Sequence, residues 1–243
     1  TYMFARCSSI TSLDLTSLDT SEVTSMRGMF DNCSDLTNLD LTPLDTQNVT
    51  NMSGMFNSCE SLTSLDLSPL NTKNVTDMSW IFSSCVGLSS IDLSPLDTNN
   101  VTDTSFMFYG CTGLKTLDLT PMNTSKVVTM QQMFYDCSGL TSLDLTSLDT
   151  RNVMGMSGMF QGCKSLINLD LSSLNTQKVT SMNSMFLDCD SLSTLSIGEK
   201  FAFVGTYYNL PSDTWYSSNG TAYISNGNSC TIPSDKADTY TRK

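Results

Sequence analysis

Residues 29–54 read MFDNCSDLTNLDLTPLDTQNVTNMSG, and this 26-residue stretch recurs along most of the chain. Its Met-Phe pair and its Cys return at the same spacing, without an insertion. Units begin at residues 3, 29, 55, 81, 107, 133, 159 and 185, so seven are complete and an eighth starts before the pattern stops near Ile197. Such constant self-similarity is typical of a solenoid, in which each unit packs against its neighbours.

Two periodicities alternate within a unit. Residues 36–41 (LTNLDL) end in an apolar–polar alternation, which predicts a half-buried strand. Later apolar residues have the spacing of one helix face: Val49, Met52, Met55, Phe56 and Cys59. We therefore predict an α/β solenoid over residues 1–197, a leucine-rich-repeat-like right-handed coil of seven to eight units with one parallel sheet and short helices. Residues 198–243 are predicted to form a small β-rich C-terminal cap.

Composition excludes several classes of function. The chain has 24 acidic and 12 basic residues, so its net charge is −12 and it repels nucleic-acid phosphates. Histidine is absent, which removes the commonest general base and the commonest zinc ligand. No apolar stretch approaches the ~20 residues of a membrane span. We expect no enzyme, no metal or cofactor, no nucleic-acid binding and no membrane insertion of this fragment. Because the first unit starts without a cap, we also expect further repeats or a cap before Thr1.

One Cys recurs in every unit: Cys7, Cys33, Cys59, Cys85, Cys111, Cys137, Cys163 and Cys189. Adjacent copies would lie one coil apart, about 5 Å, which is within disulfide range. Each copy nevertheless sits among apolar residues, where Cys behaves as a small hydrophobic residue. We therefore predict a structural column of buried free thiols. Cys230 lies outside the repeat and makes the cysteine count odd.

A second column is acidic: Asp14, Asp40, Asp66, Asp92, Asp118, Asp144 and Asp170. Each Asp is flanked by two inward apolar residues, so its side chain is predicted to face solvent. Carboxylates stacked at about 5 Å match the separation in a retaining glycosidase, or could collect Ca²⁺. A catalytic pair needs to occur only once, however, and the Gly and Asp spacing of a calcium loop is missing. A structural role, with each Asp bound to nearby hydroxyl or N–H groups, is the favoured interpretation.

Differences between units are the better guide to binding, because a uniform face can recognise only a uniform ligand. The last position of the units is occupied by Gly28, Gly54, Trp80, Phe106, Gln132, Gly158 and Ser184. The third position is occupied by Ala5, Asp31, Asn57, Ser83, Tyr109, Tyr135, Gln161 and Leu187. The two positions are three residues apart and would share a helix face. Trp80, Phe106, Tyr109 and Tyr135 should thus form one aromatic patch, a candidate ligand-binding surface. The alternative is that Phe106 compensates for the replacement of a core Met by Thr104.

The last 47 residues are rich in aromatic residues and contain two turn signals, Asn219-Gly220 and Asn226-Gly227. As type I′ turns, these predict a meander of three strands over residues 215–218, 221–225 and 230–232. Because the open end of a solenoid exposes its core, this segment is predicted to act as the cap. Carbohydrate binding by Trp215 and Tyr216 is the less economical alternative.

The repeat resembles the 26-residue repeat of BspA-like leucine-rich-repeat surface proteins of bacteria. The resemblance rests on Asn-Val-Thr-(Asp/Asn)-Met-Ser at 48–53 and 74–79, followed by MFxxC and LxxLDL(S/T), and covers residues 3 to about 197. It implies an extracellular protein on a bacterial cell surface or cell wall, with adhesion to a host extracellular protein or glycan. A passive spacer is the second hypothesis, and a polysaccharide-active enzyme using paired Asp the weakest.

Overall fold

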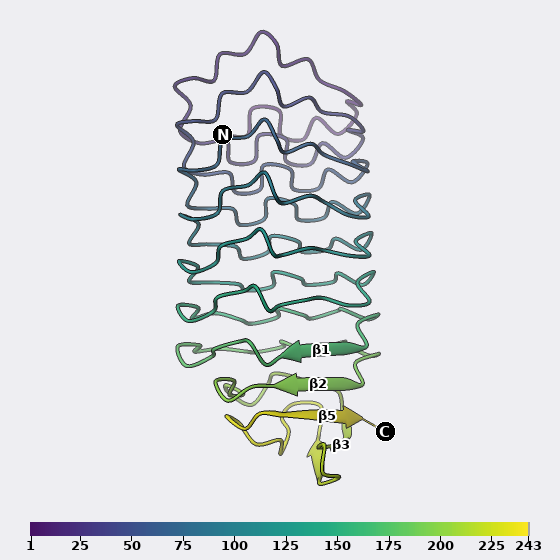
Figure 1. The fold of residues 1–243 in the computed structure, drawn as a ribbon. Helices are drawn as coiled ribbons and strands as arrows, with labels where there is room; N and C mark the ends of the chain where they lie inside the picture. The colour runs from purple at the N-terminus through teal and green to yellow at the C-terminus, as the bar shows by residue number, and fades with distance from the viewer. Residues whose placement is uncertain (243) are drawn as a thin grey trace.

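The protein is a stack of coils, seen edge-on in Figure 1, in which one 26-residue unit makes one turn. A computed structural model describes residues 1–242, and the two ends of the chain lie at opposite ends of the stack. Single parallel β-bridges join residues 26 apart on one side of the coils, from Ser25↔Asn51 to Gly155↔Ser181. The predicted solenoid is therefore present.

A column of phenylalanine rings forms the centre of the core. It runs through Phe4, Phe30, Phe56, Phe82, Phe108, Phe134, Phe160 and Phe186. Successive ring centroids are 5.8 to 6.3 Å apart, with nearly parallel planes. Leucine, methionine and valine columns surround the rings and are almost completely buried. Because each coil covers its neighbour's apolar edge, the core is continuous along the stack.

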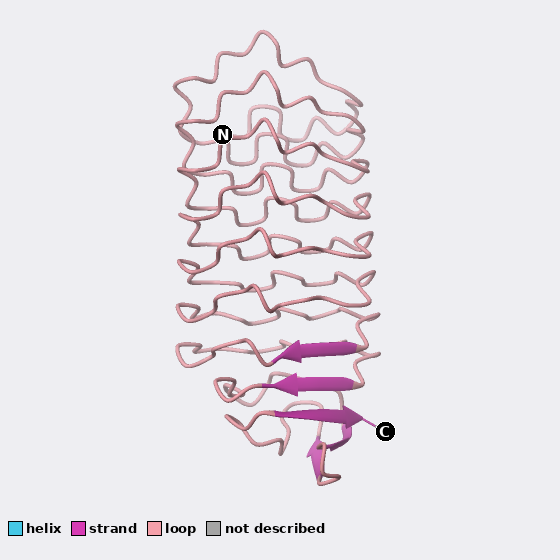
Figure 2. Ribbon diagram, viewed as in Figure 1, coloured by secondary structure: helices cyan, strands magenta, loops and turns pink. Residues whose placement is uncertain are grey.

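The predicted short helices are wrong, since no helix occurs in residues 1–242 (Figure 2). In residues 52–59, alternate N–H groups donate to the next coil, for example Gly54 N to Ser79 O at 2.8 Å. The remaining N–H groups close tight turns, such as that of Met55 N onto Met52 O at 3.1 Å. Gly54 has a φ of 61°, which fits the third residue of a type II turn and interrupts any helix. The helix-like spacing of apolar residues thus arises from consecutive turns.

The predicted parallel sheet is only partly formed. Strands β1 (Asn168–Leu171) and β2 (Thr194–Ile197) pair in parallel with Leu169 opposite Leu195. Earlier coils keep the same alternation of burial, with Leu39 and Leu41 buried and Asp40 exposed, but form no regular strand there. Figure 2 shows strands only at the C-terminal end of the stack. In most of the stack, neighbouring coils are joined instead by side-chain and backbone hydrogen bonds on the other sides of the coils, in addition to the shared core.

A column of buried threonines links every coil to the next: Thr20, Thr46, Thr72, Thr98, Thr124, Thr150 and Thr176. Each hydroxyl makes two hydrogen bonds to the backbone of one residue in the following coil, one to its N–H and one to its C=O. The Thr98 Oγ1, for instance, accepts from Asn123 N at 2.7 Å and donates to Asn123 O at 3.2 Å. Thr176, the last member, makes the same two hydrogen bonds to Ala202, so the C-terminal segment continues the stack beyond the repeats.

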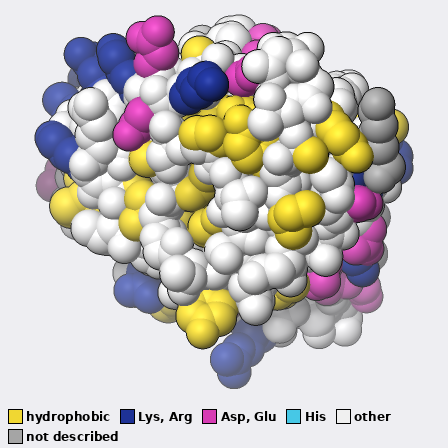
Figure 3. Space-filling model, turned by 90° about the horizontal axis from the view of Figure 1, so that it is seen from below, with side chains coloured by type: hydrophobic (Ala, Val, Ile, Leu, Met, Phe, Trp, Pro, Cys, Tyr) yellow, Lys and Arg dark blue, Asp and Glu magenta, His cyan; other side chains and the backbone are white. Residues whose placement is uncertain are grey.

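The C-terminal segment covers the last coil with three antiparallel strands. Strand β5 (Asp238–Arg242) pairs with β2, and β3 (Asp213–Tyr216) joins β5 to β4 (Ala222–Ser225), so the sheet order is β1-β2-β5-β3-β4. Figure 3 views the molecule from this end, where hydrophobic side chains form separate patches among neutral polar atoms. Trp215 and Tyr240 are fully buried. A binding surface built on the Trp215 indole is therefore excluded.

Two details of the predicted cap are wrong. Residues 230–232 form no strand, since only Cys230 bridges to Ser225, and the prediction missed β5. The turns are also not type I′, because Gly220 and Gly227 have φ of 84° while neither preceding Asn has a positive φ. A type I′ turn requires positive φ at both central residues.

Candidate functional site: an aromatic patch on the flank of the coils

The structure brings together all four aromatic residues of the proposed patch. The rings of Trp80 and Phe106 stack with centroids 3.8 Å apart, and those of Tyr109 and Tyr135 with centroids 4.4 Å apart. Trp80 and Tyr109 are 5.6 Å apart, which joins the two pairs. We call these four residues the aromatic patch. It forms because the 26-residue period places equivalent positions next to each other, and not because of a helix face.

The backbone under the patch is strained. Every residue at this position of the repeat has a positive φ, between 51° and 63°: Tyr2, Gly28, Gly54, Trp80, Phe106, Gln132, Gly158 and Ser184. Glycine adopts such a conformation freely, whereas in a bulky residue a positive φ costs about 1–2 kcal/mol of conformational free energy. The fold therefore favours Gly here, and Trp80 and Phe106 are held at this position against the backbone preference.

The patch lies at the surface. Trp80 is 38% exposed, and Phe106, Tyr109 and Tyr135 are half-buried. Thr104, which replaces a core Met, is fully buried and donates its hydroxyl hydrogen to Thr129 O at 3.3 Å. Because the Phe106 ring stacks on the exposed indole, it lies outside the space of the missing Met. Partial burial raises the pKa of the Tyr109 hydroxyl, and the nearby Tyr135 adds to the shift, so this phenol is a neutral donor at physiological pH.

The structure also shows a feature that the sequence reasoning missed, a cavity beside the patch. Its volume is about 380 Å³, and Trp80 forms one wall while Tyr2 forms another. Gly28 and Gly54 lie between them. The sequence contained a signal for it, because two successive glycines in a column otherwise able to hold aromatic rings leave a gap between larger neighbours.

The acidic column lies on a different side of the coils, with every Asp exposed. Each carboxylate accepts a hydrogen bond from the N–H two residues later, as Asp40 does from Thr42 at 2.9 Å. The same bond recurs throughout the column. These bonds lower the pKa of several members, for example Asp66, whose main partner is the backbone of Ser68. Within residues 1–242, no group of three His, Cys, Asp or Glu side chains is arranged to hold a metal ion.

The cysteine column lies in the interior as free thiols, with only Cys7 and the separate Cys230 partly accessible. From Cys33 to Cys189, each Sγ donates to the carbonyl of the Phe 29 residues earlier, at 3.0 to 3.2 Å. Burial raises the pKa of the Cys111 thiol to about 12. A buried, protonated thiol is a poor nucleophile and a poor metal ligand.

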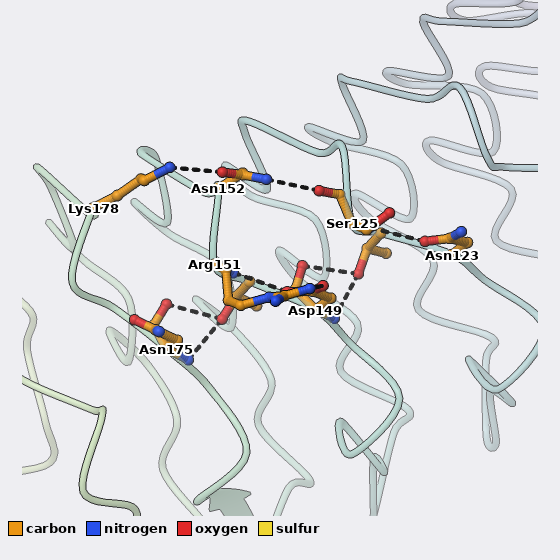
Figure 4. Close-up of polar contacts among 9 residues, drawn as sticks. Asn123, Ser125, Asp149, Arg151, Asn152, Asn175 and Lys178 are labelled. Atoms are coloured by element: carbon orange, nitrogen blue, oxygen red, sulfur yellow. Dashed lines mark hydrogen bonds and ion pairs between the residues drawn. The ribbon is translucent and has the colours of Figure 1, made fainter.

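Polar side chains tie neighbouring coils together along another edge (Figure 4). Asn152 donates to Ser125 O at 2.8 Å and accepts from Lys178 Nζ at 2.7 Å. Arg151 and Asp149 form an ion pair at 2.6 Å, the only one within the described part of the chain. Their bonds are satisfied within the fold, so this edge offers few free groups to a ligand.

Residues 1–242 form no helix, and therefore none that is long and apolar enough to cross a membrane. Among solved structures, the chain is similar to a leucine-rich repeat protein of T. pallidum, with 22% identity, a TM-score of 0.46, and 68% of this chain and 69% of that chain covered. It is also similar to a leucine-rich repeat protein from Eubacterium ventriosum (17% identity, TM-score 0.34, 76% and 43% covered). A third is a leucine-rich cell surface protein from Faecalibacterium prausnitzii (18% identity, TM-score 0.27, 79% and 74% covered).

A search of curated proteins found no match. A family profile described as "Mycoplasma protein of unknown function, DUF285" matches residues 1–114 and again 88–198, which together span the repeats. The predicted resemblance to the 26-residue repeat of BspA-like leucine-rich-repeat surface proteins is confirmed. Because this profile matches well over half of the chain, the chain belongs to the DUF285 family.

Proposed function

We propose that this protein is a non-enzymatic recognition module on a bacterial cell surface, and that its aromatic patch adheres to a host extracellular protein or glycan. One observation carries the proposal. Trp80 and Phe106 occupy backbone positions with φ of 60°, where three other coils have Gly, yet their rings lie at the surface. Strain that is retained at an exposed cluster points to function rather than to packing.

The composition of the patch supports recognition. Tryptophan and tyrosine dominate binding hot spots because they bring large, rigid contact areas with a polar atom at the edge. The underlying coils are tied by core, threonine and backbone columns, so the rings are displayed on a pre-ordered frame. A pre-ordered surface loses little conformational entropy when it binds.

The non-enzymatic and surface assignments have separate support. Each Asp of the acidic column is engaged within its own coil in the same way, so no pair is set apart for general acid and base roles. The location on a bacterial cell surface is inferred from the resemblance of the repeats to those of BspA-like proteins.

Surface plasmon resonance against matrix proteins and mucin-type glycans tests the proposal. The test variant is Trp80→Gly/Phe106→Gly, because Gly removes the rings and suits the positive φ. The matched control is Gln132→Gly/Ser184→Gly, which makes the same backbone change in the same column without removing an aromatic ring. A ligand should bind the wild type and the control, and bind the test variant at least tenfold more weakly, about 1.4 kcal/mol. If nothing binds the wild type, or if both double variants behave alike, the recognition role of the patch fails, and in the first case a spacer is the better account.

A further inference from the structure

The geometry points to a binding site for a neutral pyranose sugar in the cavity between Tyr2 and Trp80, so that the protein recognises a glycan rather than a protein segment. This inference deepens the proposed function and rests on it. It concerns a site next to the aromatic patch, which shares Trp80 with the patch and has a floor, a second wall and polar groups of its own.

The cavity exists because of the side chains that surround Gly54. The Tyr2 ring lies over Gly28, where a Cβ atom would come within 2.2 Å of the Tyr2 Cε1 atom. At Gly54 the nearest atoms to such a Cβ are the Cβ atoms of Asn57 and Trp80, at 3.8 and 3.9 Å. The space above Gly54 is therefore open, between the Tyr2 ring on one side and Trp80 on the other. Its volume of about 380 Å³ is that of a small-ligand site.

The Trp80 ring is placed to form a stacking wall. One face of the indole packs on Phe106 at 3.8 Å, with an interplanar angle of 9°. Phe106 follows Trp80 by one coil and Gly54 precedes it, so the opposite face of the indole borders the cavity. The axial C–H groups of a pyranose form a flat apolar face that matches such a ring.

The polar groups of the cavity supply both donors and acceptors. Asp31 Oδ1 accepts from Asn57 Nδ2 at 2.6 Å, which leaves Asp31 Oδ2 and Asn57 Oδ1 without hydrogen bonds in the described structure. The Arg27 guanidinium lies 5.8 Å from the centre of the Tyr2 ring and supplies donors at the rim. Sugar hydroxyls both donate and accept, so they suit this mixture better than a purely apolar side chain does.

Charge narrows the ligand class. The cavity lining includes two carboxylates, Asp31 and Asp77, and one cation, Arg27, in a chain of net charge −12. Acidic sugars would therefore be repelled. A neutral hexose or N-acetylhexosamine at a chain end or branch is the fitting ligand.

Titration with neutral methyl glycosides and with the corresponding uronic acids, followed by tryptophan fluorescence, tests the site. Trp80 is partly exposed and Trp215 is fully buried, so a change on binding reports on Trp80. Gly54→Gln should fill the cavity and weaken neutral-sugar binding at least tenfold, because Gln132 shows that Gln fits this column at a φ of 51°. Gly158→Gln is the control outside the cavity, because Gly158 has a φ of 63° against 61° for Gly54. Its new Cβ displaces the flexible side chain of Gln132, whose Cγ lies 2.8 Å away.

The outcomes separate this inference from the proposed function, since Gly54→Gln leaves the four rings of the aromatic patch in place. Neutral-sugar binding that Gly54→Gln alone abolishes supports the site. If the wild type binds a matrix protein through the patch but no neutral sugar at millimolar concentration, the sugar site is overturned and the recognition role stands. Sugar binding that is equal in both variants, or stronger for uronic acids, also overturns the site.

Discussion

Replacing Thr98 by Val should destabilise the stack, because the Thr98 hydroxyl satisfies two backbone groups of the next coil. Its Oγ1 atom accepts from Asn123 N at 2.7 Å and donates to Asn123 O at 3.2 Å. Thr98 is only 3% exposed, so water cannot easily replace the hydroxyl. Valine has almost the same shape, and the substitution therefore removes the two bonds with little change in packing.

The expected magnitude follows from the two orphaned groups. An unsatisfied buried backbone group costs about 1–3 kcal/mol. Allowing for partial relaxation, Thr98→Val should lower the free energy of unfolding by about 2–4 kcal/mol. In a protein of this size, that corresponds to a fall in Tm of roughly 5–15 °C.

Thr102→Val is the matched control. The Thr102 hydroxyl donates to Thr76 O at 3.1 Å, but the Thr102 N–H also donates to that carbonyl at 2.8 Å, and Val128 occupies the equivalent position in the next coil. This exposed substitution should change stability by no more than about 0.5 kcal/mol. Urea and thermal unfolding followed by circular dichroism measure both variants. Equal unfolding midpoints for Thr98→Val and Thr102→Val would refute the argument that the buried hydroxyls hold the coils together.

Three further predictions concern the other columns. Phe108→Ala should lower the free energy of unfolding by about 3–5 kcal/mol, because it opens a cavity in the ring stack. Phe106→Gly should change the free energy of unfolding by only about 1 kcal/mol. Unfolding curves that rank the two variants in the opposite order would contradict this prediction. In native protein at mildly alkaline pH, iodoacetamide should label only Cys7 and Cys230, as peptide mass spectrometry can establish. The free energy of unfolding should fall as the pH rises above the ordinary thiol pKa of about 9, because buried thiols keep their protons while unfolded ones lose them. Asp66 should titrate below its ordinary pKa of 3.8 in carboxyl NMR spectra, because the Ser68 N–H stabilises the charged form. The contribution of Asp66 to stability is therefore present above pH 3.8 and is lost as the pH falls below it. Titration at the ordinary value would show that the hydrogen bond is absent in solution.

The fold was largely predictable from the constant repeat, but the local structure was not. Apolar residues three and seven apart fit a helix and also fit consecutive turns, so Val49 to Cys59 did not distinguish the two. The decisive information was the glycine at the end of several units, such as Gly54, because a positive φ there interrupts a helix. The alternation at Leu39, Asp40 and Leu41 predicts which side chains are buried, while the regular strand that it normally implies forms only near the C-terminus.

The aromatic patch could be predicted for a reason that is independent of secondary structure. In any solenoid with a fixed period, Trp80 lies beside Phe106 and Tyr109 lies beside Tyr135, whether the coil there is a helix or a turn. For the cavity, the spacing predicts only the gap that Gly28 and Gly54 leave in the column. Its shape also depends on the Tyr2 ring lying over Gly28 and leaving Gly54 uncovered, which is a matter of side-chain direction and not of spacing.

Comparison along one column gives the strongest argument for the proposed binding role of the patch. Eight residues of the column share nearly the same φ, so the backbone is constant while the side chain varies. At a position of constant backbone, a change from Gly to a bulky residue adds about 1–2 kcal/mol of strain. It gains about 0.5–1.5 kcal/mol per aromatic pair, beyond the area that the ring buries. For Trp80 and Phe106 the strain offsets much of what the ring contacts contribute, and both rings stay partly exposed, so part of their apolar surface adds nothing to folding. That exposed surface is available to a ligand, and this availability is the reason for proposing a binding role.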